Sequence, residues 1–347
     1  MRSDLRSFLL DAGASEADIA RAEAEGWLPL LALDRLAAPG RATYDVAAVA
    51  ALAGGDEERL RRLWRAVGFP DVPDRVAAFT EADVEAARRV LQGAVARRSD
   101  FSTVLRHVRV ISSAMTRVAA MLAEYYGDEV IELRDRGVAD DDAAWTLVDD
   151  FDGVELVSLL VYAARLQLRA ALWRRLARDA VPDLAVAIGF ADVSGYTELS
   201  AELDADRLAD FVGRWEELAY DTVAEHGGRV VKTIGDEVMF AGLSLPVARI
   251  AIALRDAARA RGLPPMRSGI AAGMVVARDG DFYGPVVNLA SRLTEIAPAG
   301  TIYASEALRE ELAGEGSLVW SELGTRELRS IGPVAVFCLL GESGTSA

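Results

Sequence analysis

Cysteine is almost absent from this sequence, in which Cys338 is the only one among 347 residues. A single thiol excludes a disulfide framework and a site in which several thiolates bind a metal. Proteins without disulfides are typical of a reducing cytosol. We therefore expect a cytoplasmic protein whose chemistry does not depend on thiols.

Long hydrophobic runs are missing as well. The most apolar segment, residues 154–173, contains Arg165 and Arg169, and its longest uncharged run covers residues 156–164. That run is far shorter than the roughly 20 apolar residues of a membrane-spanning helix. The start of the chain, MRSDLRSFLLDAGASEADIA, has early acidic side chains and a short apolar stretch, which disfavours a signal peptide. We expect no membrane partner.

Positive charge is scarce relative to negative charge. The 54 acidic and 38 basic residues leave a formal net charge of -16, which argues against tight, non-specific binding of a nucleic-acid backbone. A local anion site is compatible with this balance. The apolar content of 52% and the charged content of 27% are those of a globular protein, and the length allows two domains.

The composition changes near residue 180. Residues 1–180 are rich in Ala, Leu, Arg and Glu at helical spacing, which predicts an all-helical domain that ends in a long helix over about 154–180. Pro182 is expected to end that helix. Residues 181–347 follow the order β-α-β-β-α-β, which predicts an α+β domain with a ferredoxin-like sheet and helices on one face.

The segment FADVSGYTELS predicts a strand that delivers Asp192 at its C-terminal end. Ser194 and Gly195 then turn the chain, and a helix is expected to begin after Thr197 or Ser200. A strand-end carboxylate beside exposed turn N–H groups can hold Mg²⁺ while the N–H groups bind phosphate oxygens. Taken alone, the segment is better interpreted as an aspartate that caps a turn.

The segment VVKTIGDEVMF, residues 230–240, predicts two strands joined by a tight turn at Gly235 and Asp236, since glycine adopts positive φ freely. Lys232 occupies a central position of an otherwise apolar strand, where an ammonium group is unusual. In the expected strand order, the hairpin tip lies near the end of the first strand, so Asp236 and Asp192 become neighbours. Two adjacent carboxylates repel each other unless a cation lies between them.

A third segment, DGDFYGPVVNLASRL, places Asn288 and Arg292 four residues apart on one face of an expected helix. Such a pair suits a contact to a sugar and a phosphate. Asp281 precedes the helix in a stretch rich in turn formers, where we expect a loop. Taken alone, these residues are better interpreted as a solvated arginine, a capping asparagine and a turn aspartate.

Taken together, the segments FADVSGYT, KTIGDEVMF and DFYGPVVNLASRL resemble the three signature segments of class III nucleotidyl cyclases. The resemblance covers about residues 183–340, and its strength lies in the order and spacing of several short motifs. It implies a cyclase catalytic domain that converts ATP to 3′,5′-cyclic AMP and pyrophosphate. A catalytically idle nucleotide-binding sensor and a DNA-binding regulator are the alternatives, and the complete motif set argues against the idle sensor.

The resemblance implies a role for each motif residue. Asp192 and Asp236 correspond to the two metal-binding aspartates, with the Val193 carbonyl as an additional ligand for two Mg²⁺ or Mn²⁺ ions. Asn288 and Arg292 correspond to the transition-state pair. Asn288 would orient the ribose, and Arg292 would stabilise the charge that develops at the α-phosphate.

Lys232 and Asp281 correspond to the adenine-selecting pair. A donor and an acceptor suit the N1 and N6 edge of adenine, whereas guanylyl cyclases of this kind typically have Glu and Cys there, so we expect ATP rather than GTP. Phosphate is expected to contact the turn that consists of Ser194, Gly195, Tyr196 and Thr197. The family's Leu-Lys-Gly segment near the C-terminus is replaced by ELRSIGP, in which Arg329 stands for the lysine and the glycine is missing.

The spacing of Lys232 and Asp236 bears on the oligomeric state. Four residues of extended strand span about 13 Å, and one nucleotide covers that distance poorly while its base packs in a dry pocket. The family solution is a head-to-tail dimer, in which one subunit provides the metal aspartates and the other provides the remaining four residues. The resemblance therefore implies a homodimer with two equivalent active sites at the subunit interface.

Residues 43–92 resemble the helix-turn-helix and wing start of MerR-type regulators, in which a helix can enter the major groove of DNA. Four arginines would lie on the second helix, namely Arg59, Arg61, Arg62 and Arg65. We favour the alternative of a helical scaffold for protein contacts, whose arginines pair with nearby Asp and Glu, because the chain is acidic. We therefore expect no nucleic-acid partner.

In size, helicity and domain order, the chain also resembles mycobacterial cyclases with an autoinhibitory, pH-responsive N-terminal domain. The resemblance implies that a shift of the long helix 154–180 changes how two catalytic domains face each other. If pH is the input, His107 is the candidate titrating residue. A helix histidine without a regulatory role and a sensor made of carboxylates are the alternatives. His226 is expected at a helix end.

Overall fold

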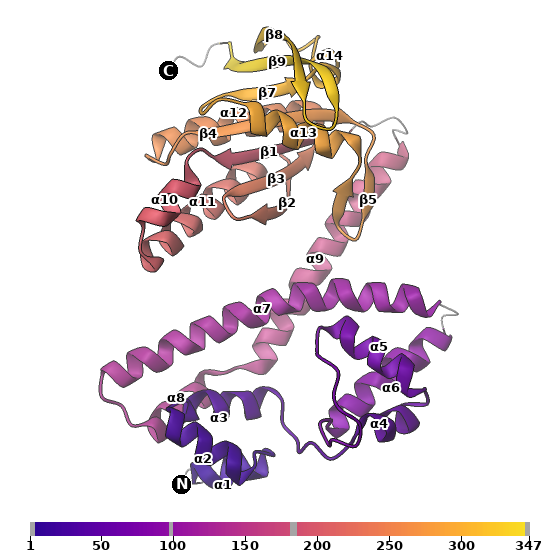
Figure 1. The fold of residues 1–347 in the computed structure, drawn as a ribbon, viewed down its shortest axis with the longest axis vertical. Coiled ribbons are helices and arrows are strands. Elements are labelled where there is room, and N and C mark those ends of the chain that lie inside the picture. The colour runs from indigo at the N-terminus through magenta and orange to yellow at the C-terminus, as the bar shows by residue number, and fades with distance from the viewer. Residues whose placement is uncertain (1–3, 97–99, 181–185, 344–347) are drawn as a thin grey trace. The chain divides into compact units, whose positions relative to one another are not determined.

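The computed structural model describes residues 4–96, 100–180 and 186–343. The chain divides into two compact units, Met1–Ala170 and Ala171–Ala347 (Figure 1). The boundary between them along the chain falls within a long helix, α9 (Gly153–Ala180), where the sequence predicts a helix over 154–180. Pro182, the expected end of that helix, lies outside the described residues, and the domain boundary near residue 180 stays a prediction. No helix of the described residues is long and apolar enough to cross a membrane.

The N-terminal unit is helical, as the sequence predicts. Its other helices are α1 (Leu5–Asp11), α2 (Glu16–Glu25), α3 (Leu28–Ala37), α4 (Val46–Ala53), α5 (Glu57–Val67), α6 (Glu81–Ala96), α7 (Phe101–Asp135) and α8 (Asp140–Asp150). Within the described part of this unit, β-pairing is confined to one isolated bridge between Tyr44 and Phe79. Leu60 and Phe79 are buried in a core formed mainly by α4, α5 and α6.

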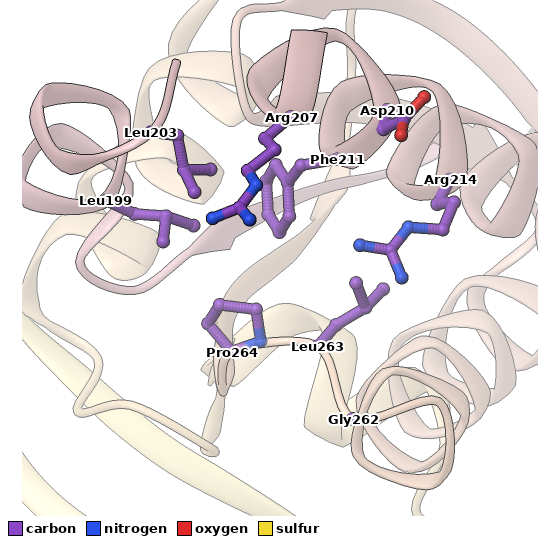
Figure 2. A pocket seen from close by; sticks show the side chains of 9 residues that line it. All are labelled: Leu199, Leu203, Arg207, Asp210, Phe211, Arg214, Gly262, Leu263 and Pro264. Atoms are coloured by element: carbon purple, nitrogen blue, oxygen red, sulfur yellow. The ribbon is translucent and has the colours of Figure 1, made fainter.

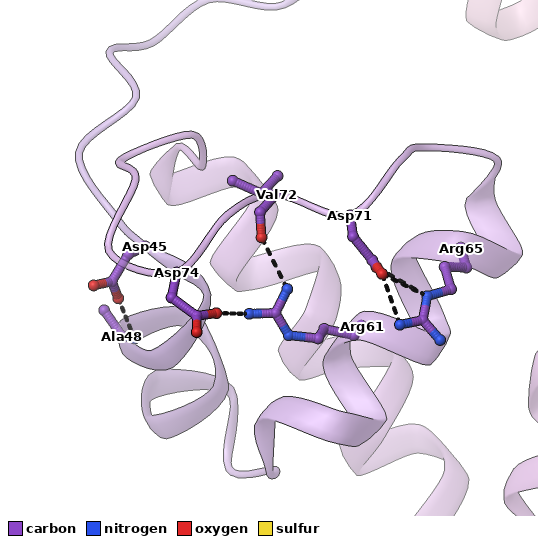
Figure 3. Close-up of polar contacts among 7 residues, drawn as sticks. All are labelled: Asp45, Ala48, Arg61, Arg65, Asp71, Val72 and Asp74. Carbon is purple, nitrogen blue, oxygen red and sulfur yellow. Dashed lines mark hydrogen bonds and ion pairs between the residues drawn. The ribbon is translucent and has the colours of Figure 1, made fainter.

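Two arginines of α5 are held by groups of the loop that follows it (Figure 3). Arg65 donates hydrogen bonds to both oxygens of the Asp71 carboxylate, with Nε–Oδ1 and Nη2–Oδ2 distances of 2.9 and 2.7 Å. Arg61 donates to the Val72 carbonyl at 2.8 Å and pairs with Asp74. The predicted pairing of these arginines with nearby acidic residues is therefore confirmed.

The other two arginines of α5 are also engaged within the unit. The guanidinium carbons of Arg59 and Arg62 lie 5.6 and 5.4 Å from the centroid of the Phe101 ring at the start of α7. Such cation–π contacts fix the orientation of a helix against its neighbour. All four arginines of α5 thus have partners within the unit, as the protein-scaffold interpretation expects, and the absence of a nucleic-acid partner stays a prediction.

The C-terminal unit contains a seven-stranded sheet in the order β2-β3-β1-β4-β7-β9-β8 (Figure 1). Its strands are β1 (Val186–Val193), β2 (Arg229–Ile234), β3 (Glu237–Gly242), β4 (Met266–Gly273), β7 (Ile302–Ser305), β8 (Leu318–Leu328) and β9 (Gly332–Glu342). Neighbouring strands are antiparallel, except that β4 and β7 are parallel. A separate two-stranded ribbon consists of β5 (Val276–Arg278) and β6 (Asp281–Tyr283). The predicted α+β class is confirmed.

Helices cover both faces of this sheet, which corrects the expectation of helices on one face. They are α10 (Tyr196–Glu202), α11 (Ala205–Glu225), α12 (Ser244–Ala260), α13 (Pro285–Ile296) and α14 (Glu306–Glu311). Trp215 of α11, Ile250 of α12 and Leu308 of α14 share one core. On the other face, Ile188 of β1 packs with Ala290 of α13. The strands are apolar on both sides, so both faces need a covering layer.

Helix α13 approaches strand β4 closely because Gly269 has no side chain. A Cβ atom at Gly269 would lie 2.3 Å from the backbone oxygen of Ala290 and 2.3 Å from the backbone nitrogen of Thr294. Those atoms belong to the helix backbone, which cannot rotate away as a side chain can. The depth at which α13 lies on the sheet therefore depends on this glycine.

Replacing this glycine tests that dependence. Gly269→Ala is expected to lower the free energy of unfolding of the C-terminal unit by about 1–3 kcal/mol, because overpacking forces the helix outward. Chemical denaturation followed by circular dichroism measures the change. Gly213→Ala is the matched control, since a Cβ atom at Gly213 of α11 would meet nothing within 4 Å. Equal stability of the Gly269 variant and the wild type would contradict the argument.

Candidate functional site

Two aspartates from different strands lie at one end of the sheet. Asp192 is the penultimate residue of β1 and pairs in register with Glu237, the first residue of β3. Asp236 occupies the turn between β2 and β3, where Gly235 has a φ of 61°. The antiparallel pairing of β1 with β3 thus makes the two carboxylates neighbours, as the strand order predicts.

A cavity of about 510 Å³ opens beside these aspartates. Its walls come from the end of β1, the turn and first residues of α10, the hairpin tip, β4 and the loop after α13. The lining residues are Asp192, Val193, Ser194, Gly195, Tyr196, Thr197, Glu198, Asp236, Arg267, Ala297, Pro298 and Ala299. The cavity therefore unites the three predicted metal-binding residues with all four residues of the predicted phosphate-binding turn.

The electrostatics of the cavity favour a cation. Burial, together with a hydrogen bond to Asp192 and the charge of Asp192, raises the pKa of Asp236 to about 7. Burial also raises the pKa of Glu237 to about 7, and the charges of Asp192 and Glu295 add to this. Burial and the neighbouring charge both disfavour the ionised form of these carboxyls, and a bound cation would offset both effects.

The donor set fits a divalent cation that is bound together with a phosphate. No group of three or more His, Cys, Asp or Glu side chains suited to a metal occurs among the described residues. Mg²⁺ is commonly bound by one or two carboxylates, with water and substrate phosphates as the remaining ligands, and Mn²⁺ accepts similar oxygen donors. Asp192, Asp236 and the Val193 carbonyl match that pattern.

The sequence did not indicate five of the lining residues, namely Glu198, Arg267, Ala297, Pro298 and Ala299. Arg267 of β4 is the basic side chain among them. Its Nε donates to Asp192 Oδ2 at 2.7 Å, and its Nη1 donates to the Glu295 carbonyl at 3.3 Å. A basic side chain within an apolar strand segment, here MRSGIAAG, was the available signal, as it was for Lys232.

The predicted adenine-selecting pair is already in contact within one chain. Lys232 Nζ donates to Asp281 Oδ2 at 2.6 Å, and the two side chains are 35% and 23% exposed. The expected loop around Asp281 is wrong, because Asp281 is the first residue of β6 and pairs with Arg278 of β5. The turn that makes this ribbon is formed by Asp279 and Gly280, which have φ values of 54° and 87°.

Three other predicted residues do not line the cavity of this chain. Asn288 is exposed on α13, and Arg292 pairs with Glu295 on the next turn of the same helix. Arg329 is exposed, directly after the end of β8. In one chain, the carboxylate cavity is therefore lined by the predicted metal-binding and turn residues, and the predicted transition-state pair lies elsewhere.

A second cavity, of about 330 Å³, lies between α10, α11 and the loop that precedes β4 (Figure 2). Its lining residues are Leu199, Leu203, Arg207, Asp210, Phe211, Arg214, Gly262, Leu263 and Pro264. None of the residues predicted from the sequence lines it, and it brings no two carboxylates together. The cavity beside Asp192 and Asp236 is therefore the candidate active site.

The two histidines lie outside both cavities. His107 is exposed on α7, and its regulatory role stays a prediction. His226 follows the last residue of α11, and its Nδ1 lies 3.0 Å from the Thr222 carbonyl oxygen. The expected position of His226 at a helix end is confirmed.

Comparisons with known proteins agree with the order of the two units. Residues 1–149 match a family described as the adenylate cyclase regulatory domain, and residues 180–341 match one described as the adenylate and guanylate cyclase catalytic domain. An adenylate cyclase of Streptomyces coelicolor is 35% identical over 265 residues, which cover 75% of this chain and 69% of that protein. A pH-sensitive adenylate cyclase of Mycobacterium tuberculosis is 32% identical over 301 residues, which cover 82% of this chain and 75% of that protein.

Among solved structures, the adenylyl cyclase CyaB from P. aeruginosa matches with a TM-score of 0.42 and 23% identity, over 47% of this chain and 97% of that one. The relatives in the sequence comparisons cover both units and not the catalytic unit alone. By these matches, the chain belongs to the adenylate cyclase family and combines its regulatory domain with its catalytic domain.

Proposed function

We propose that this protein is an adenylate cyclase that converts ATP to 3′,5′-cyclic AMP and pyrophosphate. One observation carries the proposal, namely that Asp192, Asp236 and the four residues of the turn after β1 line one cavity. A triphosphate requires oxygen ligands for its cations and donors for its own oxygens, and this cavity offers both. The buried Ser194 hydroxyl has no hydrogen-bond partner within the described protein, so it is available to a phosphate oxygen.

The reaction is an in-line attack of the ribose 3′-hydroxyl on the α-phosphate, with pyrophosphate as the leaving group. Two Mg²⁺ or Mn²⁺ ions held by Asp192, Asp236 and the Val193 carbonyl would supply Lewis-acid activation of the hydroxyl and the triphosphate. Arg267 would neutralise phosphate charge, since its guanidinium already faces a carboxylate in the cavity. Arg292 would stabilise the charge at the α-phosphate, and Asn288 would orient the ribose.

The base specificity follows from the Lys232–Asp281 pair. The ammonium group donates to N1 of adenine, and the carboxylate accepts from its N6 amino group. Guanine has the opposite donor and acceptor pattern at these atoms, so it would leave both side chains unpaired in a partly buried site. An unpaired buried polar group costs about 1–3 kcal/mol.

We further propose a head-to-tail homodimer. The α13 face of the sheet carries Asp192, Arg267 and Lys232. The cavity of one chain nevertheless includes neither the adenine pair nor Arg292. Exposed apolar side chains near this face suit a subunit contact. They are Ile234, Met274, Val276 and Tyr283, which are 56%, 84%, 61% and 51% exposed. A second copy would then complete each site.

A direct assay tests the activity. The full chain, incubated with ATP and Mn²⁺ or Mg²⁺ across a range of pH, is expected to release cyclic AMP and pyrophosphate. Asp192→Ala is the control and is expected to release neither. Absence of cyclic AMP at every pH, with nucleotide still bound, would instead favour a sensor that binds ATP without turnover.

Regulation by the N-terminal unit is part of the proposal, because residues 1–149 match a cyclase regulatory domain and a relative is described as pH-sensitive. The isolated segment 183–347 is expected to lose the pH dependence of the full chain. Activity measured from pH 5 to pH 8, where His and shifted carboxyls titrate, makes the comparison. The same pH profile for both proteins would contradict the proposal, and His107→Gln would show whether that imidazole contributes.

We also propose a cytoplasmic location. Cys338 is a free thiol, and it is buried in β9. Burial raises the pKa of this thiol, which keeps it in the unreactive protonated form. A lone thiol of this kind suits a reducing compartment, where ATP is also available.

A further inference from the structure

Strand β2 contains an irregularity that brings two cations to one face of the sheet. Arg229 pairs with Ala241 and Lys232 pairs with Met239, and the register shifts between Val230 and Lys232. In a regular strand, residues three apart point to opposite faces. The extra residue of a β-bulge reverses that alternation.

The two cores of the sheet confirm this direction. Met239 and Ala241 belong to the core on the α13 face, whereas Phe240 and its register partner Val230 belong to the opposite core. Arg229 and Lys232 therefore both lie on the α13 face. The β5–β6 ribbon is packed on the same face, because Phe282 joins that core.

Arg229 contacts the ribbon on both sides of the residue that Lys232 contacts. Its Nη1 donates to the Gly280 carbonyl at 3.1 Å, and its Cζ lies 5.1 Å from the centroid of the Phe282 ring. The residue between these two is Asp281, whose Oδ2 accepts from Lys232 at 2.6 Å and whose Oδ1 accepts from the Phe282 N–H at 2.7 Å. Arg229 thus contacts the backbone of the residue before Asp281 and the ring of the residue after it.

The ribbon needs such an attachment. Its strands are three residues long each, and an isolated two-stranded hairpin of this size is marginally stable in water. Arg229 is half-buried, and it contacts the ribbon through both the Gly280 carbonyl and the Phe282 ring. Without it, Asp281 would keep its ion pair with Lys232 but would sample more positions, because the backbone that carries the carboxylate would be less constrained.

We propose that Arg229 is a positioning residue for base recognition, which holds the β5–β6 ribbon so that Asp281 and Lys232 present a fixed acceptor and donor to adenine. The inference rests on the proposed adenylate cyclase function. The β-bulge contributes to this positioning, because it places Arg229 and Lys232 on the same face of the sheet. Arg229 itself does not touch the nucleotide.

The test compares nucleotide selectivity among variants of the full chain. Arg229→Ala is expected to lower the ratio of kcat/KM for ATP to that for GTP by about tenfold, mainly through a higher KM for ATP, because its contacts with the Gly280 carbonyl and the Phe282 ring are lost. Arg229→Lys keeps a donor for the Gly280 carbonyl and is expected to recover part of the ratio. Arg261→Ala, an exposed arginine at the end of α12, is the matched control. A loss of folded protein lowers both activities equally and leaves the ratio unchanged.

A double variant shows whether Arg229 acts through Asp281. Asp281→Ala alone is expected to lower the ratio, and Arg229→Ala is expected to add nothing further in that background. Additive losses, or a ratio for Arg229→Ala equal to that of Arg261→Ala, would overturn the inference while the proposed base recognition stands. No effect of Asp281→Ala would overturn the proposed base recognition itself, and this inference with it.

Discussion

An equimolar mixture of Asp236→Ala and Arg292→Ala chains is expected to regain about a quarter of wild-type activity, because random pairing makes about half of the dimers heterodimers, each with one intact site. Each variant alone is expected to lose about a hundredfold or more in kcat, because the first lacks a proposed metal ligand and the second lacks the proposed stabiliser of transition-state charge. Cyclic AMP formation by separately purified and then mixed chains measures the recovery.

The recovery depends on how the site is divided between two chains. In the heterodimer, one site receives both damaged residues, and the other receives Asp236 from one chain and Arg292 from its partner. The structure motivates this division, since Asp236 lines the carboxylate cavity of its own chain and Arg292 does not. Arg292 instead pairs with Glu295 of its own helix. This ion pair must break before Arg292 can contact the phosphate.

A second mixture is the control. Asp192→Ala and Asp236→Ala remove residues from the same cavity, so no heterodimer of these two chains has an intact site, and no recovery is expected. Heterodimer formation is verified with two different affinity tags. If tagged heterodimers form in the first mixture and activity stays at the level of the single variants, the two residues act within one chain and the head-to-tail arrangement is wrong.

Exchange of the base-recognition pair is expected to have a comparably large effect on specificity. Lys232→Glu combined with Asp281→Cys should lower the preference for ATP over GTP by about a hundredfold or more, because a site built to hydrogen-bond one base then offers the wrong groups to it. The reason lies in polarity, since the proposed donor to N1 of adenine becomes an acceptor. Steady-state kinetics with each nucleotide give the ratio of kcat/KM.

The dependence on metal should not change in that double variant, since Lys232 and Asp281 lie outside the cavity that contains Asp192 and Asp236. Lys232→Glu alone is the informative control. It would put two carboxylates in place of the 2.6 Å ion pair with Asp281 and is expected to lower both stability and activity. An unaltered ATP preference in the double variant would show that another part of the protein reads the base.

Several residues of the site could be identified from the sequence because their local geometry is encoded by their neighbours. Gly235 permits the tight turn that presents Asp236, and an apolar strand that ends at a Ser-Gly turn presents Asp192. Helical spacing is equally local, so the shared face of Asn288 and Arg292 followed from their separation of four residues. Short-range rules of this kind do not require knowledge of the packed protein.

Contacts between distant segments could not be predicted in this way. The pairing of Arg267 with Asp192 joins strands that are 75 residues apart in sequence, and nothing in either segment specifies the partner. The same is true of Gly269, whose effect depends on where α13 lies. The expectation of helices on one face was wrong for this reason, because the sequence of an amphipathic helix does not specify which face of the sheet the helix covers.

From the order of its apolar segments and its turn-forming residues, the chain could be assigned to the α+β class, and its motif residues could be recognised as those of a cyclase. Packing alone revealed which of these side chains meet, because long-range contacts arise from the whole fold. The bulge in β2 is the clearest case. By strand periodicity, Arg229 and Lys232 would lie on opposite faces of the sheet. In the structure, the bulge places both on one face, where they contact the ribbon that contains Asp281.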